Sequence, residues 1–308
     1  MSALAKSQLA KAKEFESQAE KTLAKKSWFG GKEKNQEDAA ETLQQAANAY
    51  KVGGMNDEAG KCYNRVGDLY RGLSQNTEAA KAYSQAGSCF KKTSSVDAVQ
   101  SYQSAISLMM DNGRLTQAAK MSRECAELFE NDDTGDFIDK AIEYYQQAAD
   151  LFEMEDSKSQ ASTCKGKIAE LASAAKDPPD LLTAGKIYND LGINCLDSNL
   201  LKFNAKGYFL QAILCQLANG DVIGAQNALQ RYEAVDYTFS ESREGKFCSS
   251  LIKAVEEYDA EGFAQASFDY DRISKLDPWK TSMLVRIKRG IADSAGGGGG
   301  DSDEEDLT

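Results

Sequence analysis

Histidine is absent from this chain of 308 residues, and its absence excludes several kinds of chemistry. A Ser-His-Asp triad, a histidine-ligated metal site and an imidazole general base all require that residue. An enzyme with this sequence would depend on carboxylates, lysines or cysteines alone. The absence of histidine therefore removes the commonest catalytic groups, and no metal site or cofactor is expected.

Three other features are scarce. There are only three prolines, two of them adjacent, which favours long uninterrupted helices. There is no run of eighteen apolar residues and no apolar signal-peptide core at the start, so no membrane-spanning segment is expected. Basic residues are outnumbered, and the net charge of -12 argues against a general nucleic-acid binder, which needs a basic surface.

The seven cysteines are scattered, with no CxxC spacing. Cysteines without a paired pattern do not indicate a disulfide framework or a zinc site. Several of them fall on or beside an apolar helical face, where a free cysteine behaves as a small hydrophobic residue. We interpret all seven as reduced core residues of a cytoplasmic protein.

A thirteen-residue unit recurs about every twenty residues along the chain. It is clearest in EAAKAYSQAGSCF, where Ala79, Tyr83, Ala86 and Phe90 stand at offsets 0, 4, 7 and 11 and share one face of a helix. Further copies begin at these alanines, and the last two are looser: Ala39, Ala59, Ala98, Ala118, Ala141, Ala161, Ala184, Ala205 and Ala225.

Stacked copies of this unit can bury a face that a single helix cannot. Small residues at offsets 0 and 7 allow close approach, and the aromatic residue at offset 4 fills the space beside them. We therefore predict an all-α fold, a right-handed α-solenoid of tetratricopeptide-like helical hairpins with a C-terminal helical bundle. The alternative is an alanine-rich helical bundle in which the pattern arises by chance, but so many copies in one register argue against it.

Changes in composition and in the repeat pattern predict that the chain has four parts. Residues 1–34 hold an amphipathic helix and a glycine-containing loop, and residues 35–236 hold the repeats. The register lapses after Asp236, and residues 237–293 are expected to form three helices, with Trp279 in their core. Residues 294–308 combine a run of glycines with the acidic end DSDEEDLT.

Trp28 and Phe29 stand side by side in KKSWFGGKEK, with lysines on both flanks. Exposed rings can enter the headgroup zone of a membrane while lysines meet anionic lipid. Alternatively, the two rings cap the first repeat helix. At the other end, Leu307 is the one large apolar residue of the acidic tip, and it is either an anchor for a partner or simply a leucine.

Several strings resemble the alpha and beta forms of the soluble NSF attachment protein family. They are KSWFGGKEK, DNGRLTQAAK, AIEYYQQAADLF, DSNLLKFNAKGYF, SESREGK, LDPWKTSMLVRIKRGI and the closing DEEDL, and they span nearly the whole chain. Two features depart from the family pattern: the GGGGGDS insertion before the acidic end, and Thr308 where a base is expected.

The resemblance implies an adaptor, and not an enzyme, that binds the SNARE four-helix bundle (syntaxin, synaptobrevin and SNAP-25-like helices) and recruits the NSF hexamer, an AAA+ ATPase. It implies a cytoplasmic protein in peripheral contact with membrane lipid through Trp28 and Phe29. Residues implied to face the SNARE bundle are Arg114, Lys120, Lys167, Leu200, Lys202, Phe203 and Lys206. Residues implied to face the ATPase are Glu256, Glu257, Asp303, Glu304, Glu305, Asp306 and Leu307.

Two rival functions fit part of the sequence. A tetratricopeptide cochaperone scaffold would clamp acidic peptide tails in a compact cage of bases and amides, but it leaves Trp28, Phe29 and the acidic tip without a role. An enzyme using the paired carboxylates Asp132 and Asp133 would need burial to tune a pKa, and these two lie in a glycine-containing loop.

Overall fold

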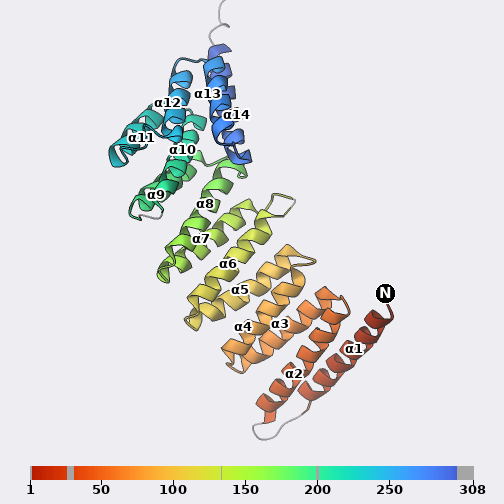
Figure 1. Ribbon diagram of the computed structural model, residues 1–308. Coiled ribbons are helices and arrows are strands. Elements are labelled where there is room, and N and C mark those ends of the chain that lie inside the picture. Colours follow the sequence, from red (N-terminus) through yellow and green to blue (C-terminus); the bar gives the residue numbers. More distant parts are fainter. Residues whose placement is uncertain (1, 26–30, 133, 199–200, 297–308) are drawn as a thin grey trace, which may run out of the picture. The chain divides into compact units, whose positions relative to one another are not determined.

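The computed structural model describes residues 2–25, 31–132, 134–198 and 201–296. Regular secondary structure in these ranges consists of fourteen α-helices, with no strand (Figure 1). The helices group into two compact units, Met1–Cys164 and Lys165–Thr308. The predicted all-α class, built from helical hairpins, is confirmed.

In the first unit each helix packs against the next along the chain, from α1 to α7. Short turns join the successive helices from α2 to α6, and neighbouring helices run in opposite directions, as Figure 1 shows. The bounds are α1 Ala3–Leu23, α2 Gly31–Val52, α3 Asn56–Gly72, α4 Asn76–Phe90, α5 Ser95–Asp111, α6 Leu115–Glu130 and α7 Ile138–Met154, followed by α8 Lys158–Ala174, which spans the division between the units.

The second unit is arranged around α10, which contacts α9, α11, α12 and α14. The bounds are α9 Leu181–Leu196, α10 Lys202–Ala218, α11 Val222–Val235, α12 Arg243–Glu256, α13 Ala260–Ile273 and α14 Pro278–Gly296. Three helices therefore follow Asp236, as predicted. Trp279 is buried, and its indole N–H donates to the hydroxyl of Ser173 at 2.9 Å, which confirms its core position.

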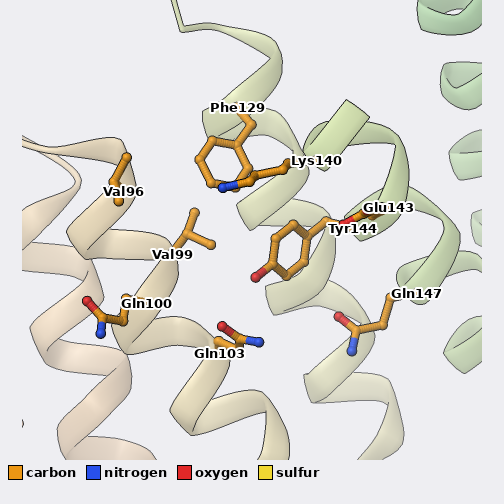
Figure 2. A pocket seen from close by; sticks show the side chains of 9 residues that line it. All are labelled: Val96, Val99, Gln100, Gln103, Phe129, Lys140, Glu143, Tyr144 and Gln147. Atoms are coloured by element: carbon orange, nitrogen blue, oxygen red, sulfur yellow. The ribbon is translucent and has the colours of Figure 1, made fainter. Parts of the chain in front are cut away.

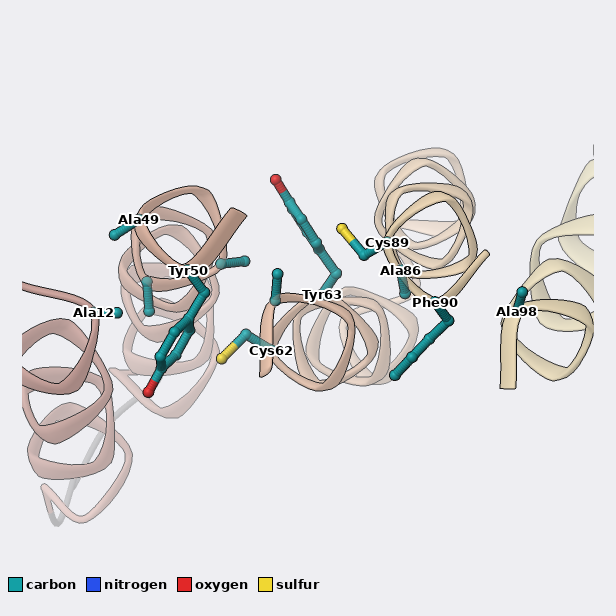
Figure 3. Close-up of a cluster of buried hydrophobic side chains, with 12 residues drawn as sticks. Ala12, Ala49, Tyr50, Cys62, Tyr63, Ala86, Cys89, Phe90 and Ala98 are labelled. Carbon is teal, nitrogen blue, oxygen red and sulfur yellow. The ribbon is translucent and has the colours of Figure 1, made fainter. Parts of the chain in front are cut away.

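The face predicted from the repeat is the buried face of the helices. Ala79, Tyr83, Ala86 and Phe90 of α4 are all buried, and the matching residues of α2, α5 and α7 are buried as well. Figure 3 shows how side chains from α1 to α5 form one continuous cluster. Since the alanines add little volume, adjacent helices approach closely and the tyrosine and phenylalanine rings fill the remaining space.

Where the residue at offset 8 of a helix is glycine, the aromatic ring at offset 4 of the next helix lies against it. A Cβ added to Gly67 of α3 would lie 2.7 Å from the ring of Tyr83, and one added to Gly192 of α9 would lie 2.5 Å from the ring of Phe209. Side chains at these two glycines would collide with the rings. The repeat therefore has a further constrained position that the sequence pattern had not revealed.

The tyrosine hydroxyls are paired with polar residues of the preceding helix. Tyr83 donates to Asp68 Oδ1 at 2.6 Å, and Tyr63 donates to Asn48 Oδ1 at 2.6 Å, each partner lying fifteen residues earlier. A half-buried hydroxyl without such a partner would lose the hydrogen bonds it makes with water. The pairing thus lets a large ring enter the core while its polar end stays satisfied.

Alkaline pH is expected to destabilise the fold through these tyrosines. Burial, followed by the hydrogen bond to Asp68, raises the pKa of Tyr83 to about 12 from its usual 10. Because the folded pKa is the higher one, the stabilisation is fully present below pH 10 and is lost as pH rises toward 12. Urea unfolding at pH 8 to 11 should show the loss. Tyr83→Phe should make the free energy of unfolding less dependent on pH, whereas Phe203→Ala, at an exposed ring, should leave that dependence unchanged.

All seven cysteines are free and buried, which confirms their interpretation as reduced core residues. Burial raises the pKa of Cys125 and of Cys215 to about 12, so their thiols stay protonated near neutral pH. Within the part of the chain that the structure describes, no group of three potential ligands could hold a metal ion. The cysteines therefore offer neither a nucleophile nor a metal site.

Candidate functional site

Exposed apolar and basic side chains gather where α10 begins and where α11 leads into α12. Residues of both segments line a hollow of about 310 Å³, which we call the Phe203 surface: Leu196, Lys202, Phe203, Lys206, Val235, Asp236, Tyr237 and Thr238. The two rings protrude furthest, with Phe203 73% and Tyr237 86% exposed. Large rings this exposed add nothing to the core, which makes them candidates for a partner contact.

The loop after α11 is held by a buried ring. Phe239 is fully buried, and its ring centroid lies 5.5 Å from that of Phe209 and 6.1 Å from that of Tyr232. The turn before it is closed by Asp236, whose Oδ1 accepts the N–H of Thr238 at 3.0 Å. Because Phe239 points inward, the neighbouring positions of the loop are left on the surface.

The basic residues of this surface are anchored beside the rings. Lys206 Nζ donates to the carbonyl oxygen of Thr238 at 3.3 Å, joining α10 to the loop. Lys202 Nζ lies 5.6 Å from the centre of the Phe203 ring, within reach of a cation–π interaction. The surface thus presents aromatic area with two cations and a single acid, Asp236, which suits a partner that offers both apolar and acidic groups.

The structure brings together three of the residues predicted to face a SNARE bundle: Lys202, Phe203 and Lys206. Leu200 lies outside the described residues. Sequence reasoning missed Val235 and Tyr237 of the same surface. The signal in the sequence was an aromatic residue in VDYTFS, at the point where the repeat pattern ends and a buried position is no longer expected.

Arg114 and Lys120 belong to the first unit. Arg114 is the residue before α6, where its carbonyl oxygen accepts the N–H of Ala118 at 3.0 Å, and both basic side chains are exposed. Lys167 lies on α8 in the second unit and forms an ion pair with Glu170 at 3.2 Å. The charge of Lys167 is therefore partly balanced within its own helix.

The residues predicted to face an ATPase lie at and beyond the end of α12. Glu256 is the last residue of α12 and Glu257 its C-terminal cap; both are exposed, and Glu257 lies 3.9 Å from Lys253 Nζ. The other predicted contacts lie outside the described residues: Asp303, Glu304, Glu305, Asp306 and Leu307.

Trp28 and Phe29 also lie outside the described residues, between the end of α1 and the start of α2. Among the described helices, none is both long enough and apolar enough to cross a bilayer. In the loop proposed for the rival enzyme, Asp132 accepts the N–H and the hydroxyl of Thr134, an ordinary turn contact, and Asp133 is outside the described residues.

A second hollow, of about 550 Å³, lies in the first unit between α5 and α7, as Figure 2 shows. Lys140 Nζ lies 5.9 Å from the ring centre of Phe129 and 5.4 Å from that of Phe137. Glutamine side chains occupy much of the rest of its wall, together with Tyr144. Glu143 is the one carboxylate among its lining residues, so the hollow does not hold the paired carboxylates that the rival enzyme requires.

The sequence model of the soluble NSF attachment protein family, SNAP, matches residues 10–292. The chain belongs to this family. The resemblance inferred from the sequence motifs is thereby confirmed. Individual relatives cover nearly the same span.

The alpha-soluble NSF attachment protein of Vitis vinifera is 37% identical over 96% of this chain and 97% of its own length. The alpha-soluble NSF attachment protein of Homo sapiens is 37% identical, with 91% and 89% covered. The vesicular-fusion protein SEC17 of Coprinopsis cinerea is 35% identical, with 92% and 96% covered. The chain therefore covers most of the length of each of these relatives.

Proposed function

We propose that this chain is an adaptor that binds SNARE four-helix bundles and recruits and stimulates the NSF ATPase, so that the bundles are taken apart during vesicle trafficking. Membership of the family supports this proposal, as do the names of relatives, which refer to NSF attachment and to vesicular fusion. The observation that carries it is the Phe203 surface, whose exposed rings and flanking lysines suit the binding of a protein partner.

A SNARE bundle has the chemistry that this surface would bind. Four-helix bundles of the coiled-coil type are rods with apolar seams and charged flanks. Phe203 and Tyr237 offer ring area to the apolar parts, and Lys202 and Lys206 offer charge to acidic flanks. We place Arg114, Lys120, Lys167 and Leu200 in the same role on the rest of the chain. The SNARE helices would be those of syntaxin, synaptobrevin and SNAP-25-like proteins.

The two ends of the chain would engage other partners. Glu256 and Glu257, together with the acidic tip and its Leu307, would contact the ATPase, which works as a hexamer. Trp28 and Phe29 would touch membrane lipid and hold a cytoplasmic protein at the membrane periphery. The four-part division at residues 34, 236 and 293 is proposed on the same grounds, since it separates these three tasks.

The cochaperone alternative is not favoured. It rests on the repeat architecture alone, and folds of this kind serve many functions. The family match extends over residues 10–292, beyond the repeats and through the C-terminal helices. A tetratricopeptide cochaperone shares the repeats but gives no reason for that longer match.

Replacement of Trp28 and Phe29 by serine should lower disassembly of liposome-borne SNARE bundles by about tenfold and leave disassembly of soluble bundles unchanged. Membrane contact raises the local concentration of an adaptor near its target, and only membrane-anchored bundles benefit from it. Both rates can be followed by loss of fluorescence transfer between SNARE helices. Equal losses on the two substrates would count against a membrane role.

Leu307→Ala should reduce ATPase-driven disassembly by several-fold while binding to SNARE bundles stays intact. Loss of a buried leucine anchor weakens a contact by about 1.5 kcal/mol or more. The decisive experiment is a pull-down of an NSF hexamer on immobilised SNARE bundles with the full chain, with Leu307→Ala and without the last eight residues. Thr308→Ala is the matched control. Recovery of the ATPase by the shortened chain would refute the assignment of the tip.

A further inference from the structure

A groove runs along α14 in the second unit, and the partners assigned above leave it unused apart from Glu256 at its rim. A hollow of about 530 Å³ lies between the α10–α11 turn, the end of α12 and α14. Its wall includes Ile223 and Tyr258, which are 71% and 59% exposed, above the buried Ile287 and Ile291. We call it the α14 groove.

Unpaired cations lie on the same helix. Arg286 and Gly290 also line an adjoining hollow of about 640 Å³, which Arg289 shares. Arg286, Lys288 and Arg289 are exposed, and among the described residues none of these three has a carboxylate within ion-pair distance. Arg286 Nε donates instead to the carbonyl oxygen of Ala218 at 3.3 Å.

The two arginines of the lining are the groups left for an acidic occupant, since no carboxylate among the described residues pairs with either. Two acids also line the hollows, Glu256 in the first and Asp293 in the second. Lys288 is a further exposed base of α14, although it lines neither hollow. An occupant should therefore offer carboxylates for the arginines and one apolar side chain for the pocket beside Ile223 and Tyr258.

The last residues of this chain have that composition. The eight residues DSDEEDLT carry five acids and no base, and Leu307 is their single large apolar side chain. We propose that this acidic tail binds the α14 groove of its own chain, with Leu307 in the apolar pocket and the carboxylates on Arg286 and Arg289. The tail then has a second, intramolecular partner.

The connection has the length that this docking needs. α14 ends at Gly296, and Arg286 lies ten residues earlier, about 15 Å back along the helix axis. The eleven residues from 297 to 307 can span at most about 40 Å when extended. A flexible chain of that length has a typical end-to-end distance of about 18 Å, of the same order as the separation required. The five glycines 296–300 therefore suit a return along α14.

Tethering makes even a weak contact effective. A short flexible linker gives its end group an effective concentration on the order of millimolar, so docking is populated without high intrinsic affinity. The docked tail would hold Leu307 away from other partners until they compete for it. The proposal concerns the chain alone, so it stands or falls independently of the partners proposed above.

The test uses the full chain with Thr308→Cys carrying a nitroxide spin label; the seven native thiols are buried and so do not compete for the label. Relaxation enhancement is measured on isoleucine methyl groups by NMR. We expect Ile223, Ile287 and Ile291 to be broadened several-fold more than Ile193 and Ile273, which do not line the groove. Raising salt from about 0.05 M to 0.5 M should reduce the difference, because the ionic part of the contact is screened.

Arg286→Glu with Arg289→Glu should abolish the difference, and Leu307→Ala should weaken it. The matched control, Lys61→Glu with Lys120→Glu, makes the same change in charge in the first unit and should leave it intact. The methyl spectrum itself shows whether each variant is folded. If the double arginine variant does not fold, the salt series and Leu307→Ala still test the contact with the unaltered groove. Equal broadening of groove and reference methyls would overturn the proposal. The proposal would also be overturned if the broadening proved to be only intermolecular. That case is tested in a mixed sample in which the spin label and the isotope are on different copies of the chain.

Discussion

Phe203→Ala together with Lys202→Glu is expected to lower the affinity for assembled SNARE bundles by about thirtyfold. Truncation of an aromatic anchor at an interface typically costs about 2 kcal/mol or more, and 1.4 kcal/mol corresponds to a factor of ten. Phe203 is 73% exposed, so its loss removes partner contact and not core packing. Fluorescence anisotropy with a labelled soluble bundle measures the change directly.

Two further observations sharpen this result. The loss of affinity caused by reversing the charge of Lys202 should be smaller at high salt than at low salt, because salt screens the electrostatic contribution of this residue. The matched control is Val52→Ala with Lys51→Glu in α2, which removes an exposed apolar side chain and reverses an exposed charge elsewhere. Unchanged affinity for the Phe203 variant, or an equal loss in the control, would remove the Phe203 surface from the interface.

Gly245→Ala is expected to lower the free energy of unfolding by about 3 kcal/mol, at the upper end of the usual cost of overpacking. A Cβ at this position would collide with the backbone carbonyl of Phe239, and backbone atoms cannot turn aside as a flexible side chain can. The same residue donates its N–H to Ser242 Oγ at 3.0 Å, the capping bond at the start of α12. The loop that carries Tyr237 should loosen as well.

Urea unfolding is the measurement, with the midpoint falling at constant slope. Gly166→Ala is the matched control, since a Cβ there meets nothing within 4 Å and the site is inside α8. Alanine is favoured over glycine inside a helix by about 1 kcal/mol, so this variant should gain stability. A loss below about 1 kcal/mol for Gly245→Ala would mean that the loop gives way easily, contrary to the packing described.

The buried face of the repeat could be predicted because it depends on local periodicity. Ala79, Tyr83, Ala86 and Phe90 share a face whatever their neighbours are, and one such face must be covered. The constraint at offset 8 could not be predicted in this way, since the size of the residue there depends on which side chain the next helix places against it. Where that helix carries small Ser122 at offset 4, offset 8 is the larger Ile106, and both residues are buried.

The candidate site was recoverable only in part. Lys202, Phe203 and Lys206 lie within five residues and could be found together through a family string. Tyr237 reaches the same surface from thirty-four positions beyond Phe203, through the packing of Phe239 against Phe209 and Tyr232. No local pattern encodes that approach. Likewise, the ion pair between Lys167 and Glu170 depends on side-chain conformation, which periodicity does not predict.

Seven of the fourteen described helices hold one buried cysteine each. Cys62 lies in α3 and Cys248 in α12, and the others are spread over α4, α6, α8, α9 and α10. A protonated, enclosed thiol reacts with an alkylating reagent only when its helix opens, so each thiol reports the opening of one segment. Alkylation under native conditions, read by mass spectrometry, would therefore rank the helices by local stability without adding a single probe to the protein.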